Sequence, residues 1–67
     1  MEVTRLVYMA NHIGKALRLE RDAVAGIEDH LRRFWDPRMR REITAHLAAG
    51  GEGLDPDVRT AVARLAG

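Results

Sequence analysis

Few side chains in this sequence have the types and spacing that catalysis requires. The chain contains no cysteine and no serine, so the hydroxyl groups of Thr4, Thr44 and Thr60 are the remaining candidate nucleophiles. No complete catalytic constellation accompanies these threonines, although a hydroxyl needs an adjacent base to react. Residues 50–53, Gly-Gly-Glu-Gly, lack the following Lys-Ser/Thr pair and the preceding strand of a phosphate-binding loop. We therefore predict no active site in this chain and interpret residues 50–53 as a helix stop followed by a turn.

The histidines are the remaining candidates for metal binding. Imidazole is a common zinc ligand, but His12, His30 and His46 would have to converge from three different helices. Their spacing matches no recognised metal motif. We expect no metal and no cofactor in this chain, and we interpret His46 as a hydrogen-bonded histidine on an apolar helix face.

Recognition chemistry is concentrated in residues 30–41, His-Leu-Arg-Arg-Phe-Trp-Asp-Pro-Arg-Met-Arg-Arg. This segment holds five of the eleven basic residues and two of the three aromatic residues of the chain. Arg and Trp are enriched among the residues that dominate protein–protein binding, and Arg suits the bidentate recognition of carboxylates and phosphates. The segment therefore predicts a partner-binding corner, which we assign to Arg33, Trp35, Arg38, Met39, Arg40 and Arg41.

A solvated, internally paired surface is the alternative for the same arginines. Glu28 precedes Arg32 by four residues, and Asp29 precedes Arg33 by four, which is the favourable order for helical ion pairs. The other arginines of the segment have weaker structural explanations, because they fall in the first turns of a helix, where the helix dipole disfavours cations. These are Arg38, Arg40 and Arg41.

The two aromatic residues of the segment continue an apolar stripe. Phe34 is predicted to lie in the core, whereas Trp35 fits either the core or an accessible position at the corner. A second contact patch on the first helix is also possible, although an ordinary solvated face is the better explanation of its residues. These residues are Tyr8, Asn11, Lys15 and Arg18.

The elements that must position these side chains are all helical. Apolar residues recur at three- and four-residue steps from Leu6 to Leu17, and Thr4 is the expected N-cap of that helix. Asp22 could cap a second helix that ends near Trp35, but one continuous helix over residues 4–35 remains an alternative. Gly14 falls near the apolar stripe and would permit the close approach of another helix.

Two Asp-Pro pairs mark the remaining helix starts. Asp is a strong N-cap, Pro favours the first turn, and Pro disfavours helical backbone in the residue before it. The chain is therefore predicted to turn a sharp corner at Asp36-Pro37 and to begin a short C-terminal helix at Asp55-Pro56. Residues 50–51 end the third helix. The predicted inner faces consist of Met39, Ile43, His46 and Leu47, and of Val58, Ala61, Val62 and Leu65.

Composition limits the class of protein. Sixty-seven residues with a formal net charge of +1 make one small domain with a thin core and no strong field for nucleic acid or anionic membrane. The first ten residues do not form the uninterrupted apolar run of a signal peptide, and no stretch approaches the ~20 apolar residues of a membrane helix. We predict a single all-α domain over residues 1–67, a small bundle of three main helices and a short C-terminal helix, in the cytoplasm.

Several sequence blocks resemble a known family. Met-Ala-Asn-His-Ile-Gly at residues 9–14, Arg-Phe-Trp-Asp-Pro-Arg-Met-Arg at 33–40, Ala-His-Leu at 45–47 and Gly-Leu-Asp-Pro at 53–56 are similar to the small delta subunit of NAD-dependent formate dehydrogenases. The block at 33–40 is the most specific, and the resemblance covers roughly residues 5–65.

The resemblance implies a non-catalytic accessory subunit of a cytoplasmic formate dehydrogenase. In such complexes the large catalytic subunit carries a bis-pyranopterin molybdenum or tungsten cofactor and iron–sulfur clusters, and other subunits pass electrons to NAD through FMN. The delta subunit is expected to carry no redox centre, to dock on the large subunit, and to support the assembly or stability of the complex.

Two other classes of protein fit the residues without the resemblance. One is a small helical nucleic-acid binder that presents Arg38, Arg40, Arg41 and Thr44, although the near-neutral charge counts against it. The other is a homodimeric helical adaptor.

Overall fold

Four helices make up the fold in a computed structural model that describes residues 2–67. They are α1 (Val3–Leu17), α2 (Ala23–Phe34), α3 (Pro37–Ala48) and α4 (Pro56–Ala66), and no strand occurs among these residues. The all-α prediction is therefore confirmed.

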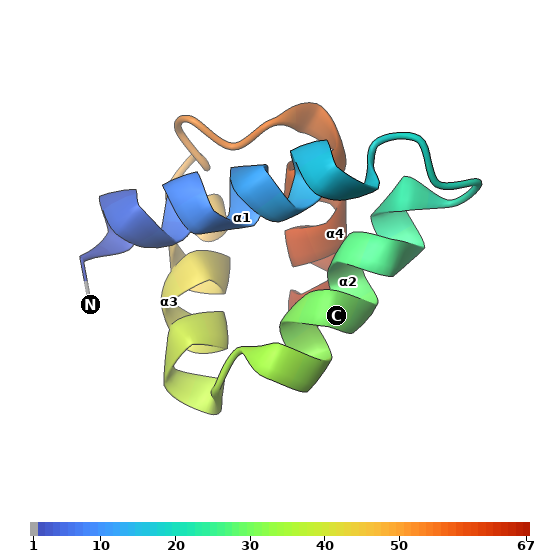
Figure 1. Ribbon diagram of the computed structural model, residues 1–67. Helices are drawn as coiled ribbons and strands as arrows, with labels where there is room; N and C mark the ends of the chain where they lie inside the picture. The colour runs from blue at the N-terminus through green and yellow to red at the C-terminus, as the bar shows by residue number, and fades with distance from the viewer. Residues whose placement is uncertain (1) are drawn as a thin grey trace.

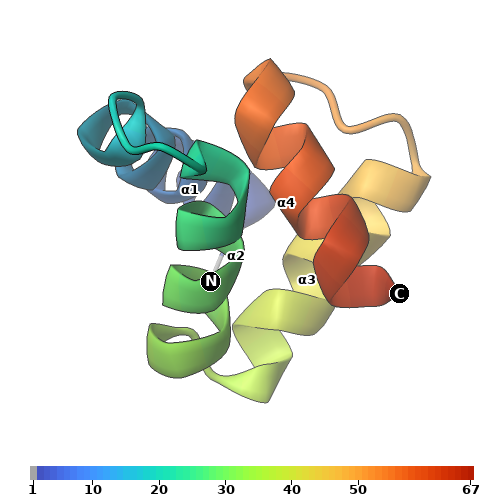
Figure 2. The same cartoon turned by 90° about the vertical axis from the view of Figure 1, so that its right-hand side faces the viewer.

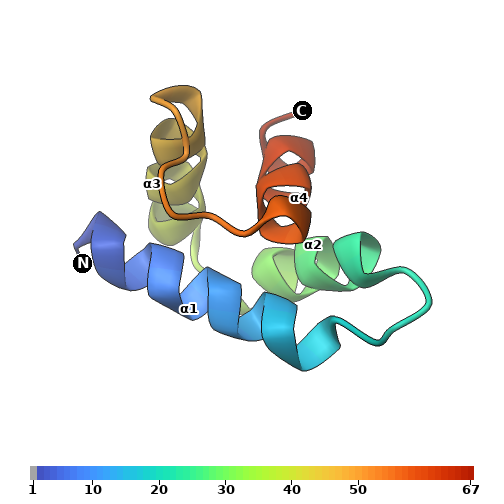
Figure 3. The ribbon, with the colours of Figure 1, turned by 90° about the horizontal axis from the view of Figure 1, so that it is seen from above.

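Helices α2 and α3 form the two arms of a V, and α1 and α4 pack against them (Figure 1). In Figure 1, α2 and α3 diverge from the corner at residues 35–37, and α1 lies across the open end. Figure 2 shows α4 between the arms of the V, and α4 contacts both α2 and α3. Figure 3 shows α1 and α2 joined by the turn at residues 18–22, and the two helices contact each other although α2 runs away from α1 at an angle in Figure 1. The fold therefore leaves the outer faces of α1 and α2 next to one another.

Helices α1 and α2 are separate, which settles the alternative of one continuous helix. Asp22 caps α2, because its Oδ1 accepts a hydrogen bond from the backbone N–H of Ala25 at 3.0 Å. The predicted N-cap of α1 was wrong. Thr4 lies inside the first turn, since the helix begins at Val3 and the carbonyl of Glu2 accepts hydrogen bonds from the N–H groups of Arg5 and Leu6. Backbone bonding alone starts this helix, without a side-chain cap.

The corner at residues 35–37 follows from local chemistry. Asp36 has an extended backbone (φ −72°, ψ 165°), as expected for the residue before a proline, and Trp35 is extended as well (φ −89°, ψ 134°). Asp36 Oδ1 accepts a hydrogen bond from the N–H of Met39 at 2.9 Å, and Pro37 is the first residue of α3. Asp55 holds the equivalent position before α4, but its side chain makes no capping hydrogen bond, contrary to the prediction. Its N–H instead binds Asn11 Oδ1 at 3.0 Å, which ties α4 to α1.

A core of ten buried residues joins all four helices. Ile43 from α3 and Val58, Ala61 and Val62 from α4 are fully buried, as the predicted faces require, with Met39, Leu47 and Leu65 packed against them. Gly14 permits a close contact, because a methyl group added there would lie 2.6 Å from Val58 Cγ2. The buried residues are Leu6, Ala10, Ile27, Leu31, Trp35, Ile43, Leu54, Val58, Ala61 and Val62.

The glycine turn after α3 is fastened to its surroundings. Gly50 and Gly51 have positive φ angles of 125° and 66°, which end the helix without the strain that a side chain would add. Arg59 donates hydrogen bonds to the carbonyls of both glycines, at 2.9 and 3.1 Å. The ring of half-buried His46 hydrogen-bonds through Nε2 to the Glu52 carbonyl at 2.8 Å. His46 is thus used within the fold.

Candidate partner-docking surface

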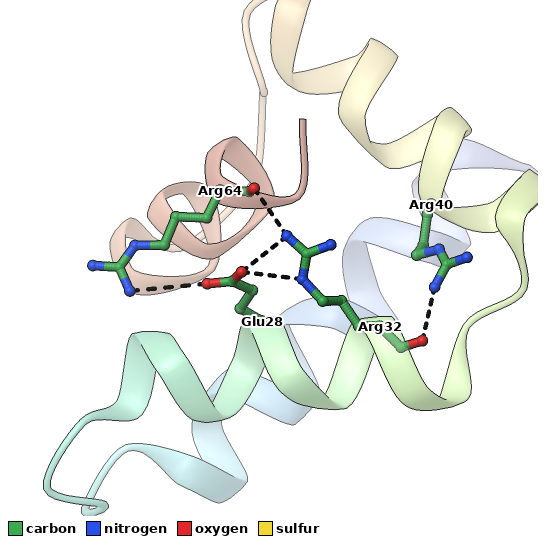
Figure 4. Close-up of polar contacts among 4 residues, drawn as sticks. All are labelled: Glu28, Arg32, Arg40 and Arg64. Carbon is green, nitrogen blue, oxygen red and sulfur yellow. Dashed lines mark hydrogen bonds and ion pairs between the residues drawn. The ribbon is translucent and has the colours of Figure 1, made fainter. Parts of the chain in front are cut away.

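Arg32 is held between two helices at the predicted partner-binding corner. Its guanidinium donates to Glu28 Oε2 from both Nε and Nη2, at 3.1 and 3.0 Å (Figure 4). The Nη2 group also donates to the backbone carbonyl of Arg64 at 3.2 Å, at the C-terminal end of α4. Glu28 lies 3.9 Å from the guanidinium of Arg64 as well. The ion pair with Glu28 was predicted, but the link to α4 was not.

Arg40 explains part of the unfavourable charge at the start of α3. Its Nη1 donates a hydrogen bond to the carbonyl of Arg32 at 2.7 Å, within the last turn of α2 (Figure 4). The C-terminal end of a helix carries partial negative charge and unsatisfied carbonyls, so a cation there is favourable. Arg40 therefore stabilises the end of one helix from the beginning of the next, and this contact ties the two sides of the corner together.

The remaining arginines of the corner are exposed. Arg33 forms an ion pair with Asp29 at 3.1 Å, and Arg38 lies 3.9 Å from Glu42. Exposed pairs of this kind contribute only about 0–1 kcal/mol to stability and leave both groups accessible. The Arg41 side chain makes no hydrogen bond or ion pair within residues 2–67. Of the predicted contact residues, Arg33, Arg38 and Arg41 are thus available to a partner, and Met39 is half-buried.

The two aromatic residues of the corner lie in different environments, and Phe34 does not lie in the core as predicted. Trp35 belongs to the core and is only 6% exposed, so little of its ring could contact a partner. Phe34 is 69% exposed, and its assignment to the core was wrong. The physical reason is the end of α2. Because Trp35 has an extended backbone, its side chain turns inward and does not follow the helical periodicity. Phe34 stays on the outer flank of α2, where its ring centroid lies 4.7 Å from that of His30.

A hollow of about 540 Å³ lies between α1 and α2. It is bordered by a second aromatic pair, in which the rings of Tyr8 and His12 are 5.7 Å apart. The sequence favoured a solvated face for Tyr8, with a second contact patch as the alternative, and it did not indicate that His12 borders a hollow. The signal that could have found the surface is the repeated spacing, because each helix pairs a histidine with an aromatic residue four positions away. The lining residues are Tyr8, Met9, His12, Ile13, Ala16, Leu17, His30 and Trp35.

A second hollow, of about 420 Å³, lies where α2, α3 and α4 meet. Arg32, Arg40, Arg41 and Thr44 line it, which are residues of the predicted nucleic-acid surface or its neighbours. Two of its three guanidinium groups already bind backbone carbonyls. These bonds occupy donors that phosphates would need, and Glu28 offsets the charge of Arg32, which weakens the case for a nucleic-acid binder.

Residues 2–67 contain neither a cluster of metal-binding side chains nor a membrane-spanning helix. No group of three or more His, Asp or Glu side chains in this part of the chain is placed to hold a metal ion. No helix in the same range has the length and apolar character needed to cross a bilayer.

Comparison with known proteins identifies the family. Residues 5–62 match the model of the NADH-dependent formate dehydrogenase delta subunit FdsD. No curated protein and no solved structure matches the chain. The matched range includes all of α2 and α3, the corner between them, and both sides of the hollow at residues 8–17 and 30–35. The chain therefore belongs to the family of NADH-dependent formate dehydrogenase delta subunits.

Proposed function

We propose that this chain is a non-catalytic accessory subunit that docks on the large catalytic subunit of a cytoplasmic formate dehydrogenase. It supports the assembly or the stability of that complex. The observation that carries the proposal is the match of residues 5–62 to the delta-subunit family. A chain of 67 residues with a thin core is also the kind of domain that a larger partner stabilises, since a partner that binds only the folded state shifts the folding equilibrium.

The chemistry of its own side chains supports a non-catalytic role. The chain has no cysteine, so it offers no thiolate for an iron–sulfur cluster. In line with the family, we assign the bis-pyranopterin molybdenum or tungsten cofactor, the iron–sulfur clusters and FMN to partner subunits. The contribution of this chain is a surface.

The predicted corner remains a candidate part of that surface. Arg33, Arg38 and Arg41 are exposed and would meet acidic groups of a partner through bidentate hydrogen bonds. Arg40 and Trp35 are directed into the fold, so they would act by shaping the corner rather than by direct contact.

The test is production of the formate dehydrogenase subunits with and without this chain. We expect the chain to co-purify with the large subunit, and we expect its omission to lower the yield of complex that reduces NAD with formate. The metal and pterin content of the large subunit distinguishes a role in cofactor insertion from a role in structure. If the chain never co-purifies, and neither yield nor activity depends on it, the proposal is wrong.

A further inference from the structure

We propose that the hollow between α1 and α2 receives an apolar segment of the large catalytic subunit that is flanked by acidic residues. This inference rests on the proposed function, which it deepens by naming the contact surface and the chemistry of the occupant. The surface consists of the hollow and the exposed apolar residues on its border, and we call it the α1–α2 face: Tyr8, Met9, His12, Ile13, Ala16, Leu17, His30, Phe34 and Trp35.

Exposed apolar side chains single out this face. Within residues 2–67 three large apolar residues are exposed, Tyr8 (68%), Phe34 (69%) and Leu19 (88%), and all of them belong to α1, α2 or the turn between them. The chain leaves these groups in water although it fully buries much smaller side chains such as Ala61. Clustered apolar exposure marks interaction sites, and aromatic residues are enriched in the buried centres of interfaces.

The shape of the face suits a side chain of a partner. The hollow has a volume of about 540 Å³, which lies within the roughly 300–1,000 Å³ typical of binding pockets. Apolar groups line most of it, including Met9, Ile13 and Leu17 of α1, and Trp35 closes it from the corner. Tyr8 lies on α1 and Phe34 on α2, each beside a histidine ring that lines the hollow. A partner segment that covers both aromatic rings would remove them from water.

Charge identifies the flanks of the occupant. Helix α1 contains no acidic residue, and its cations Arg5 and Lys15 are both exposed. Arg5 precedes Tyr8 and Met9 by three and four residues, so it lies next to the hollow on the helix surface, whereas Lys15 lines another hollow beside Asp55 and Asp57. On α2, Arg33 follows His30 by three residues, although Asp29 already pairs with it. The border is net positive, which favours a partner segment with acidic flanks.

The same charge pattern argues against a second copy of this chain as the occupant. A two-fold pairing through this face would place identical surfaces together, with α1 opposite either α1 or α2 of the other copy. In the first arrangement α1 offers no acidic residue to balance Arg5, and in the second the Asp29 carboxylate of α2 already pairs with Arg33. Like-charge juxtaposition is unfavourable at an interface.

The α1–α2 face is distinct from the hollow near Arg32 and Arg40. Helix α2 directs Phe34 and His30 to its α1 side, and Glu28 and Arg32 to its α4 side. Substitutions can therefore separate the two surfaces. The first experiment uses the full chain and the large subunit, and compares Phe34→Ala and Tyr8→Ala with the control variant Thr60→Ala at an exposed position of α4.

We expect each aromatic truncation to weaken binding to the large subunit at least about 30-fold. This is about 2 kcal/mol at about 1.4 kcal/mol per tenfold, the size of effect that defines an interface hot spot. Thr60→Ala should weaken binding less than about threefold. All three positions are exposed, and circular dichroism of each variant checks that the fold is intact.

Ala16 tests the charge of the occupant, because it lines the hollow and is exposed. Ala16→Glu should weaken binding more than Ala16→Lys, since the lysine would add to the positive border. Ala45→Glu places the same side chain at an exposed position of α3 and should leave binding unchanged. If Ala16→Glu and Ala16→Lys weaken binding to the large subunit equally, the proposal that acidic residues flank the partner segment is wrong.

The outcomes separate this inference from the proposed function. If the wild-type chain binds and Phe34→Ala and Tyr8→Ala bind equally well, the α1–α2 face is not the interface, while the accessory role stands. If the wild-type chain does not bind the large subunit at all, the proposed function and this inference both fail. If the isolated chain forms a stable dimer that the aromatic truncations dissociate, the occupant is a second copy and the inference is overturned.

Discussion

Gly14→Ala tests how closely α1 and α4 pack. A methyl group at this position would lie 2.6 Å from Val58 Cγ2, and Val58 is fully buried with a stiff, β-branched side chain. Because the neighbour has little room to move, we expect the overpacking penalty of about 1–3 kcal/mol. Replacing glycine in the middle of a helix returns about 1 kcal/mol of helix propensity. The net effect is a destabilisation of roughly 1 kcal/mol.

Gly26→Ala is the matched control for this prediction. Gly26 also lies within a helix, but its added methyl group would meet only Leu17 Cδ1, at an ordinary contact distance of 3.4 Å. We expect this variant to be more stable than the wild type by up to about 1 kcal/mol. The two substitutions change the chain by the same atoms, so their difference isolates the contact with Val58.

Urea and thermal unfolding of the full chain measure both effects. A change of 1 kcal/mol shifts the melting temperature of a domain this small by about 4–8 °C, so Gly14→Ala should melt below the wild type and Gly26→Ala above it. In a Val58→Ala background the methyl group gains room, and Gly14→Ala should become stabilising. If Gly14→Ala stabilises the unaltered chain as much as Gly26→Ala does, the tight approach of α1 and α4 is wrong.

Three further predictions concern the caps and the charge of the corner. Arg40→Ala should destabilise the chain by about 1 kcal/mol, because the carbonyl at the end of α2 loses its donor, whereas Arg38→Ala should change stability by less than about 0.5 kcal/mol in urea unfolding. Asp36→Ala should lower the free energy of unfolding by about 1 kcal/mol, because α3 loses its capping hydrogen bond. Asp55→Ala should lower it clearly less, because the Asp55 side chain makes no capping bond, and the reverse order would refute this assignment of the caps. The chain should show no binding to duplex or single-stranded nucleic acid at ~50 mM salt by fluorescence anisotropy, and a salt-sensitive affinity there would contradict the reading of the arginines as helix-end contacts.

Features that depend on neighbouring residues could be predicted from the sequence. The corner at Asp36-Pro37 is an example, because the proline and the capping aspartate act on the backbone within one turn. The position of Asp22 as the cap of α2 is another. The prediction of Thr4 as the N-cap of α1 was wrong, because a residue of a capping type does not by itself determine where a helix begins. Backbone hydrogen bonds to the Glu2 carbonyl begin the helix earlier.

Features that depend on tertiary contacts could not be predicted. The sequence shows that Arg40 lies at an unfavourable helix end, but only the fold shows that this end meets the favourable end of α2. Helical periodicity was the basis for predicting the burial of Phe34 and Trp35, but this periodicity no longer applies at Trp35, where the chain leaves the helix. The α1–α2 face requires two helices to lie side by side, so no single segment could indicate it.

The central claim is that this delta subunit contacts the large catalytic subunit through the α1–α2 face. The most direct measurement is site-specific photo-crosslinking in the assembled formate dehydrogenase, with a photoreactive phenylalanine analogue placed at position 34 and, as the control, at position 45 on the exposed side of α3. We predict efficient crosslinks from position 34 to the large subunit and few from position 45. An intact complex in which position 34 forms no crosslink to the large subunit would contradict the claim.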